Sequence, residues 1–242
     1  MASKVRLYVD HPLGEEQLVP LSREQAHYLF GVMRMAEGTV LSLINGRDGE
    51  WDAQVEQAGK RGGVLACQMQ TKPLQMPTDL WLLFAPIRKE RMSFIVEKAT
   101  ELGAARIMPV QTVYTNNGDR VRLEKLQAQA VEATEQCGGT FVPKVVAPMK
   151  LKQALADWNP NRTLYFCDEA MIGEASGFTG ARPLHGSAIL IGPEGGFSPE
   201  ERKVLRELPY SQTISLGPRI LRAETAAVAA LTLWQNAMGD WQ

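Results

Sequence analysis

The chain has little cysteine, little histidine and almost no net charge. It is 242 residues long, with three cysteines, three histidines and a formal net charge of −1. The cysteines are odd in number and far apart, so they form neither a disulfide framework nor a C-x-x-C motif, and we expect reduced, mostly buried thiols. With so few thiols and imidazoles, we expect no metal site. These six side chains are Cys67, Cys137, Cys167, His11, His27 and His185.

Long apolar runs are also absent. No uninterrupted apolar stretch approaches the roughly 18 residues of a membrane span, and no amino-terminal segment has the pattern of a signal peptide. We therefore expect a cytoplasmic protein with no membrane partner. The near-neutral charge disfavours a protein that coats nucleic acid, so any RNA contact must be local. Basic clusters at 60–61, 88–91 and 120–125 could make such contacts, although each is also typical of a solvated surface.

Residues 1–72 have the alternating pattern of a small β-rich domain. Apolar residues recur at every second position, for example at Leu65, Cys67 and Met69. Turn signals at 45–46 and 59–63 separate these runs, since Asn and Gly accept the positive φ of tight hairpins. One helix is predicted to start at Ser22, where Gln25 completes a capping box. The pattern indicates a small barrel with one helix.

A proline-containing segment at 72–78 has no periodicity, so we divide the chain into domains at 1–72 and 73–242. Beyond it the pattern of strands and helices alternates. The run at 80–84 is too apolar for a strand with one wet face, which predicts a central strand. The architecture is therefore α/β with a mainly parallel sheet. Further strands are expected at 107–110, 142–146 and 163–167, and helices at 89–102, 120–136, 151–158 and 220–237.

Two glycine-rich segments in the last third of the chain look like turns from a strand to a helix. The first, IGPEGGF at 191–197, leads into Ser198 and Pro199, a hydroxyl N-cap followed by a proline at the first helical position. The second, LGPRILRAET at 216–225, has the same layout. Ligands of open α/β sheets bind at the carboxyl ends of strands, where a third turn stands at 167–169. The turns could converge on one pocket, or they could only cap helices.

The residues of these loops narrow the choice of ligand. Neither loop has the spacing or the lysine of a P-loop, and neither fits G-x-G-x-x-G at the start of a βαβ unit. Glu194 would repel a polyphosphate, so a neutral or cationic ligand suits the first loop better. Motifs of serine hydrolases, zinc proteases and kinases are absent.

Together with their surroundings, the two loops resemble the RsmE family of ribosomal RNA small-subunit methyltransferases, within the SPOUT superfamily of knotted methyltransferases. The resemblance covers nearly the whole chain. Besides the loops it rests on KATELG at 98–103, EQCG at 135–138, RLYV at 6–9 and the segment 27–34.

This resemblance implies a PUA-like amino-terminal domain that helps to hold RNA, and a SPOUT-type α/β domain whose last segments thread a trefoil knot. It implies S-adenosylmethionine (SAM), bound bent in the knot. The implied reaction is methyl transfer to N3 of a specific uridine in 16S ribosomal RNA, either free or in the small ribosomal subunit. A homodimer with the cofactor pocket near the subunit interface is also implied.

SAM needs apolar walls and main-chain hydrogen bonds, and its sulfonium tolerates a nearby carboxylate. Both loops can supply these. The expected cofactor-binding residues are Cys167, Gly192, Glu194, Gly195, Gly196, Leu216, Gly217, Ile220 and Leu221.

For the reaction, uracil must lose its N3 proton, and the enzyme must position the ring and stabilise the developing anion. Arg222 is the first candidate to stabilise that anion. Glu194 or Glu224 could assist proton removal, although either could only cap a helix. The expected RNA-binding residues are Arg6, Arg34, Arg88 and Arg219.

Two positions depart from the family pattern. Gly139 stands where an arginine commonly follows EQCG, and VYTN at 113–116 lacks an arginine often found there. Both changes bear on RNA binding more than on the cofactor pocket. Two alternatives stay open: ribose 2′-O-methylation, which is common among knotted relatives, and a non-catalytic RNA-binding factor that keeps the fold.

Overall fold

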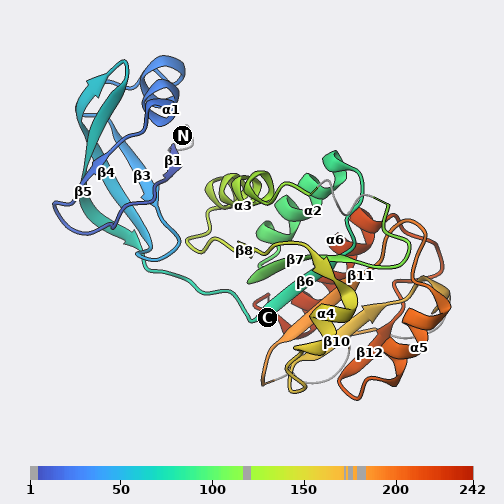
Figure 1. Ribbon diagram of the computed structural model, residues 1–242. Helices are drawn as coiled ribbons and strands as arrows, with labels where there is room; N and C mark the ends of the chain where they lie inside the picture. Colours follow the sequence, from blue (N-terminus) through green and yellow to red (C-terminus); the bar gives the residue numbers. More distant parts are fainter. Residues whose placement is uncertain (1–4, 117–120, 172, 174–176, 179–183, 242) are drawn as a thin grey trace. The chain divides into compact units, whose positions relative to one another are not determined.

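The computed structural model describes residues 5–116, 121–171, 173, 177–178 and 184–241 (Figure 1). The chain divides into two compact units. Unit 1 comprises Met1–Met76 and Thr134–Val142, and unit 2 comprises Pro77–Ala133 and Pro143–Gln242. Each unit is built around its own sheet. No helix in the described ranges is long and apolar enough to cross a membrane.

Unit 1 contains a five-stranded sheet in the order β1-β3-β4-β5-β2. β1 runs parallel to β3, and the other neighbours are antiparallel. The helical segment begins after Ser22, whose capping box with Gln25 forms as predicted, and continues as a π-helical turn. The elements are β1 (Arg6–Tyr8), β2 (Leu18–Pro20), α1 (Arg23–Ala26), η1 (His27–Val32), β3 (Val40–Ile44), β4 (Glu50–Gly59) and β5 (Gly62–Lys72).

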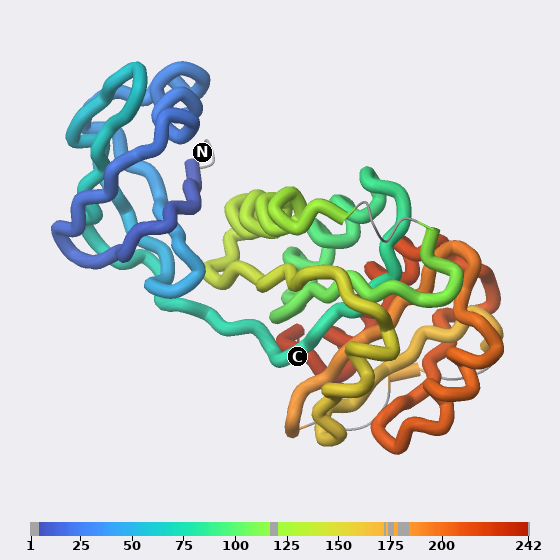
Figure 2. Tube along the Cα trace, in the orientation of Figure 1, coloured from blue at the N-terminus to red at the C-terminus, as the bar shows by residue number. Residues whose placement is uncertain are grey.

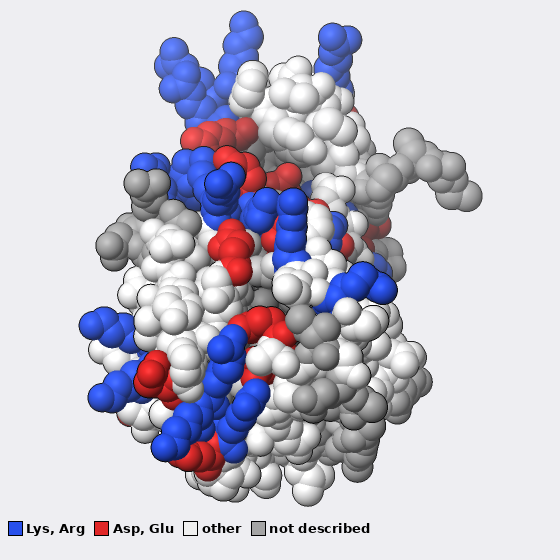
Figure 3. Space-filling model, turned by 90° about the vertical axis from the view of Figure 1, so that its right-hand side faces the viewer, with Lys and Arg blue, Asp and Glu red and all other residues white. Residues whose placement is uncertain are grey.

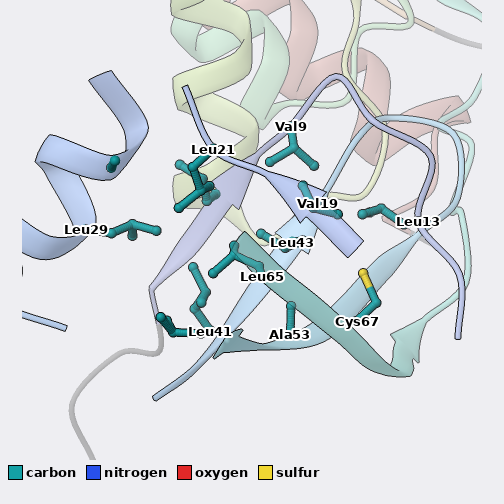
Figure 4. Close-up of a cluster of buried hydrophobic side chains, with 13 residues drawn as sticks. Val9, Leu13, Val19, Leu21, Leu29, Leu41, Leu43, Ala53, Leu65 and Cys67 are labelled. Atoms are coloured by element: carbon teal, nitrogen blue, oxygen red, sulfur yellow. The ribbon is translucent and has the colours of Figure 1, made fainter. Parts of the chain in front are cut away.

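The core of unit 1 is formed by alternate strand residues, including Leu41, Ala53 and Leu65, packed with Leu29 of the helical segment (Figure 4). The alternation fails at Met69, which was expected on the same face as Cys67 but is 61% exposed. Two residues of β5 lie opposite one residue of β4 at this point. This β-bulge exchanges the faces of the sheet toward which the following side chains of β5 point. The sequence pattern does not indicate the bulge.

Unit 2 contains strands in the order β12-β10-β11-β6-β7-β8, with β9 also paired to β7. All these pairings are parallel, and β6 lies inside the sheet as predicted. The strands are β6 (Leu80–Phe84), β7 (Arg106–Gln111), β8 (Lys144–Val145), β9 (Met149–Lys150), β10 (Thr163–Cys167), β11 (Ser187–Ile191) and β12 (Ser211–Ile214). The helices are α2 (Lys89–Glu101), α3 (Leu123–Cys137), α4 (Leu151–Ala156), the short η3 (Glu169–Met171), α5 (Pro199–Glu207) and α6 (Ala223–Met238).

Helices cover both faces of this sheet. On one face Leu164 and Phe166 of β10 pack in a cluster with Leu205 of α5 and with residues of α4. Tyr165, between them, points to the other face, where its hydroxyl lies 3.5 Å from the Met238 sulfur of α6. α6 also packs against α2, and in Figure 2 the red carboxy-terminal segment passes behind the strands while α4 lies in front. This is the α/β architecture that the sequence predicted.

The helix boundaries differ from the predictions mainly at the last helix. It was expected from Ile220, but α6 begins at Ala223, because residues 216–222 form a loop. For the helix expected from Arg120, that residue lies outside the described part of the chain, and α3 begins at Leu123. The trefoil knot stays a prediction of the resemblance.

Candidate functional site

A narrow cavity lies in unit 2 at the carboxyl ends of β10, β11 and β12. Residues of the segments 167–169, 191–196 and 214–226 line it, so the three turns do meet. We call it the loop cavity. Its volume is about 80 Å³, well below the roughly 300–1,000 Å³ of most small-molecule pockets. A larger ligand would therefore have to widen it by moving the loops.

The first loop folds tightly because residue 192 has no side chain. A Cβ atom on Gly192 would lie 2.7 Å from the Phe197 ring, closer than packed carbons allow. Phe197 is fully buried and meets the ring of Phe166 edge-on, with 4.8 Å between centroids. Ser198 then caps α5 as predicted. Its Oγ accepts a hydrogen bond from the Glu201 N–H at 3.1 Å, and the Glu201 carboxylate accepts one from the Ser198 N–H at 3.0 Å.

The second loop depends on the backbone conformation of Gly217. Its φ is +105°, which side-chain-bearing residues rarely adopt. Beyond it Ile220 stands at the rim of the cavity, 76% exposed. Arg222 takes the N-cap position of α6 but makes no side-chain capping hydrogen bond. The second turn therefore starts its helix without the hydroxyl cap of the first, contrary to the predicted repetition.

An ion-pair network around one buried carboxylate fixes the third turn. The fully buried Asp168 carboxylate accepts hydrogen bonds from Arg202 Nε at 3.1 Å and from Arg206 Nη2 at 2.6 Å. Glu169 pairs with Arg202 and accepts from the Phe197 N–H at 3.3 Å. The network ties the turn after β10 to α5 and to the first glycine loop. Neither arginine could be assigned to the site from the sequence, because no local pattern pairs residues 34 and 38 positions apart.

Arg91 of α2 connects the two candidate catalytic carboxylates. Its Nη1 lies 3.8 Å from Glu194 Oε1, and its Nε lies 3.4 Å from Glu224 Oε1. The second carboxylate oxygen of Glu224 is buried and makes no hydrogen bond within the described residues. Glu194 of the first loop and Glu224 of the first turn of α6 thus share one cation, and no local sequence pattern indicates this arrangement.

Cys167 supplies a neutral wall of the loop cavity. Its side chain is buried, and burial raises the pKa of the Cys167 thiol to about 12. Such a thiol stays protonated near neutral pH, so it packs as an apolar group. Cys67 is also buried, whereas Cys137 is exposed, so most of the thiols are buried, as predicted. All three cysteines are free.

The structure brings together most of the predicted cofactor residues. Gly195 does not line the cavity, because it faces Tyr114, with 3.4 Å between a Cβ built on the glycine and the Tyr114 Cβ. Arg222 is not part of the lining either, whereas Arg219 is. Contact of these residues with SAM stays a prediction. The eight predicted residues that do line the cavity are Cys167, Gly192, Glu194, Gly196, Leu216, Gly217, Ile220 and Leu221.

The arginines predicted to bind RNA differ in their surroundings. Arg34, Arg88 and Arg219 are exposed, and Arg88 is the N-cap residue of α2. Arg6, within unit 1, is instead enclosed and pairs with Glu50 at 2.7 Å. Its guanidinium also donates to the carbonyl oxygens of residues 134, 135 and 139, at 2.7, 2.8 and 2.6 Å. An RNA contact of Arg6 would require these bonds to break.

The pKa of Glu50 reflects this contact. Burial raises the pKa of Glu50, but the hydrogen bond and the charge of Arg6, together with the charge of Lys72 and a hydrogen bond from Thr71, outweigh that effect and leave the pKa below its usual value. Gly139, one of the departures from the family pattern, supplies a backbone carbonyl to Arg6. The Arg6 side chain thus joins β1 to the segment Thr134–Val142 inside unit 1.

Charged side chains of both signs lie near one another on one face of the molecule. On the face drawn in Figure 3, basic and acidic side chains lie in mixed groups between large uncharged areas. Among the residues that the structure describes, no group of three or more His, Cys, Asp or Glu side chains could hold a metal ion.

Comparison with known proteins identifies the family. A model of the RNA methyltransferase domain matches residues 74–235, and a model of the RNA methyltransferase PUA domain matches residues 21–65. The chain is also 31% identical to ribosomal RNA small subunit methyltransferase E of Rickettsia conorii, with 93% of each chain covered. The chain belongs to the RsmE family. The resemblance predicted from the glycine loops is thereby confirmed.

Two solved structures are similar to this RsmE-family chain over its whole length. One is ribosomal RNA small subunit methyltransferase E of Neisseria gonorrhoeae bound to S-adenosyl methionine, with a TM-score of 0.88, 25% identity and coverage of 99% of this chain and all of that one. The other is a Legionella pneumophila protein in complex with the cofactor SAM, with a TM-score of 0.84, 29% identity and the same coverage. The SPOUT fold and the amino-terminal PUA domain agree with these similarities.

Proposed function

We propose that the protein transfers a methyl group from SAM to N3 of a uridine in 16S ribosomal RNA. The observation that carries this proposal is the convergence of both glycine loops on the loop cavity in a chain of the RsmE family. Relatives of 25% and 29% identity were solved with SAM bound, which supports the same cofactor here.

The loop cavity suits SAM in its chemistry. Leu216, Leu221 and the neutral Cys167 offer apolar walls, while Glu194 and Glu169 offer negative charge to a cationic ligand. When bound, SAM supplies an electrophilic methyl group. The exposed loop around Ile220 has to move outward to admit a molecule of this size, since the cavity is narrow.

The chain's own residues would position the uracil and handle its proton. Glu194 and Glu224 are the candidates to accept the N3 proton. Arg91 pairs with both, and Glu194 lines the loop cavity. Arg222, exposed at the start of α6, would stabilise the negative charge that develops on the ring. Arg219 at the rim would bind phosphate or the base.

The proposal includes the organisation of the protein. Residues 1–72 would hold RNA, and residues 73–242 would carry the methyl transfer. α6 is rich in alanine and leaves Leu233 47% exposed, with Trp241 just beyond it 52% exposed. A second copy of the chain covering this surface would give the homodimer that the resemblance implies. A cytoplasmic location is part of the proposal, because ribosomal RNA is the proposed substrate.

Two measurements test the proposal against its alternatives. Calorimetry with SAM should detect binding, and no binding at millimolar SAM would leave a non-catalytic RNA-binding factor. Ribosomal RNA from cells lacking the gene should lose 3-methyluridine. Unchanged 3-methyluridine together with the loss of a 2′-O-methylated nucleoside would establish ribose methylation instead.

The role of Arg222 can be measured separately. Arg222→Ala should lower the turnover number at least about tenfold, because an ionic contact to the developing anion is worth more than 1.4 kcal/mol. SAM affinity should stay within about twofold, since Arg222 does not line the loop cavity. Lys152→Ala, an exposed change on α4, is the control. An unaltered turnover number in Arg222→Ala would remove Arg222 from the mechanism.

A further inference from the structure

A second and larger cavity lies in unit 2 beside the loop cavity. It is a cleft of about 1320 Å³, and its walls come from residues 87–93 at the start of α2 and residues 121–129 around the first half of α3. Glu194 lines both cavities, so the two open next to each other. We call this second cavity the basic cleft.

The charge of its walls sets the basic cleft apart from the rest of the chain. Five cations and two carboxylates line it, a local excess of three positive charges in a chain whose net charge is −1. One cation, Arg91, pairs with Glu194. No ion pair involves the other four within the described residues, and all four are exposed. They are Arg88, Lys89, Arg122 and Lys125.

The ligand of such a cleft should be an extended polyanion. The volume exceeds the roughly 300–1,000 Å³ of small-molecule pockets, and the cations are spread over two helices rather than gathered around one point. Exposed arginine and lysine side chains are the usual partners of nucleic-acid phosphates. In protein–DNA interfaces, half or more of all hydrogen bonds go to the phosphates and sugars of the backbone. A strand bound here would pass beside Glu194 at the mouth of the loop cavity.

We propose that the basic cleft binds backbone phosphates of the RNA strand that carries the target uridine. The inference rests on the proposed function, which supplies RNA as the substrate. From the sequence, Arg88 was an expected RNA contact, while the basic clusters at 88–91 and 120–125 could be either RNA contacts or a solvated surface. Lys89, Arg122 and Lys125 join Arg88 because the fold brings the start of α3 opposite the start of α2.

A double substitution tests the basic cleft without touching the candidate catalytic groups. Arg122→Gln with Lys125→Gln removes two charges from the α3 wall and leaves Arg91 in place. Lys152→Gln with Lys203→Gln removes two exposed charges of unit 2 that do not line the cleft and is the matched control. The probe is unmethylated small ribosomal subunits from cells lacking the gene, with affinity measured between 50 and 200 mM salt.

The cleft variant should bind the subunits at least about tenfold more weakly than the wild type. The slope of log affinity against log salt should become shallower by about 1.4, because each of the two lost phosphate contacts of a single strand contributes roughly 0.7. SAM affinity in calorimetry should stay unchanged, and the control variant should behave as the wild type.

Two results would overturn the inference: wild-type affinity in the cleft variant, or an equal loss of affinity in both double variants, which would indicate general charge attraction. The test does not depend on methyl transfer. A wild-type protein that fails to bind SAM would defeat the proposed function, while the contrast between the two variants would still decide whether the cleft binds RNA.

Discussion

The loop cavity and the basic cleft adjoin at Glu194 but are built in different ways. The loop cavity is formed by backbone turns, glycines and the buried Asp168, and it encloses about 80 Å³. The basic cleft is formed by long exposed side chains around about 1320 Å³. Packing should therefore control the affinity of the loop cavity for its ligand, and salt concentration should control the affinity of the basic cleft for its ligand. Changes in one should leave the ligand of the other unaffected.

The largest effect on stability is expected from Asp168→Asn, which weakens the ion pairs that hold the turn after β10 at the loop cavity. The amide keeps the size of the side chain but places a donor against Arg202 or Arg206, so two charge-assisted hydrogen bonds are weakened. Losing a buried ionic acceptor should cost about 3 kcal/mol of unfolding free energy. Denaturant unfolding and calorimetry with SAM should both report the loss.

The control for this change is Asp157→Asn, an exposed aspartate just after α4. It should alter neither stability nor SAM affinity. RNA affinity should persist in Asp168→Asn at temperatures where the variant is folded. Full stability in Asp168→Asn would mean that the network does not hold the cavity in shape.

Gly192→Ala should have the next largest effect. The added methyl group would sit 2.7 Å from the buried Phe197 ring, and overpacking of this kind costs about 2 kcal/mol. SAM affinity should fall at least about tenfold. The double variant Gly192→Ala/Phe197→Leu makes room for the methyl group and should recover part of the affinity. Gly14→Ala, where a Cβ meets nothing within 4 Å, is the control, and equal behaviour of the two alanine variants would refute the steric argument.

Cys167→Ala should have a smaller effect, on the pH dependence of the unfolding free energy, and this effect appears only at alkaline pH. Burial raises the pKa of its thiol from 9.0 to about 12, so the folded state holds the proton more tightly than the unfolded state. The resulting stability is complete below pH 9 and is lost as the pH rises toward 12. Between pH 7 and pH 10 the wild type should lose about 1.4 kcal/mol of unfolding free energy that Cys167→Ala does not lose. Cys137→Ala, at an exposed thiol, should follow the wild type.

The loop cavity could be predicted from the sequence because its signals are local. A few consecutive residues are enough to indicate each of its parts: the two glycine turns, the cap at Ser198 and the strand that ends at Cys167. Parallel strands then bring such turns to one edge of the sheet. Eight of the nine expected cofactor residues line the cavity for this reason, and Gly195 differs because the loop turns it toward Tyr114.

The remaining features depend on contacts between distant segments. The pairing of Asp168 with Arg202 and Arg206, and the position of Arg91 between two carboxylates, have no local sequence pattern. The same holds for Arg6, which the sequence assigned to RNA and the fold encloses. The basic cleft belongs to this class as well, since its cations come from two helices that only the tertiary structure brings together.

The smallest expected effect is that of salt on the affinity for SAM. Most of the wall of the loop cavity consists of turns, apolar side chains and a neutral thiol, with Asp168, Glu169, Glu194 and Arg219 as its charged lining residues. Charges around a buried ligand are screened far less than exposed charges. The dissociation constant for SAM should therefore change less than about twofold between 50 and 200 mM salt, while affinity for ribosomal subunits falls steeply over the same range. Titration of both ligands in one buffer series measures the contrast. If SAM binding weakened as steeply as RNA binding, exposed charges would govern both cavities, and the distinction between them would fail.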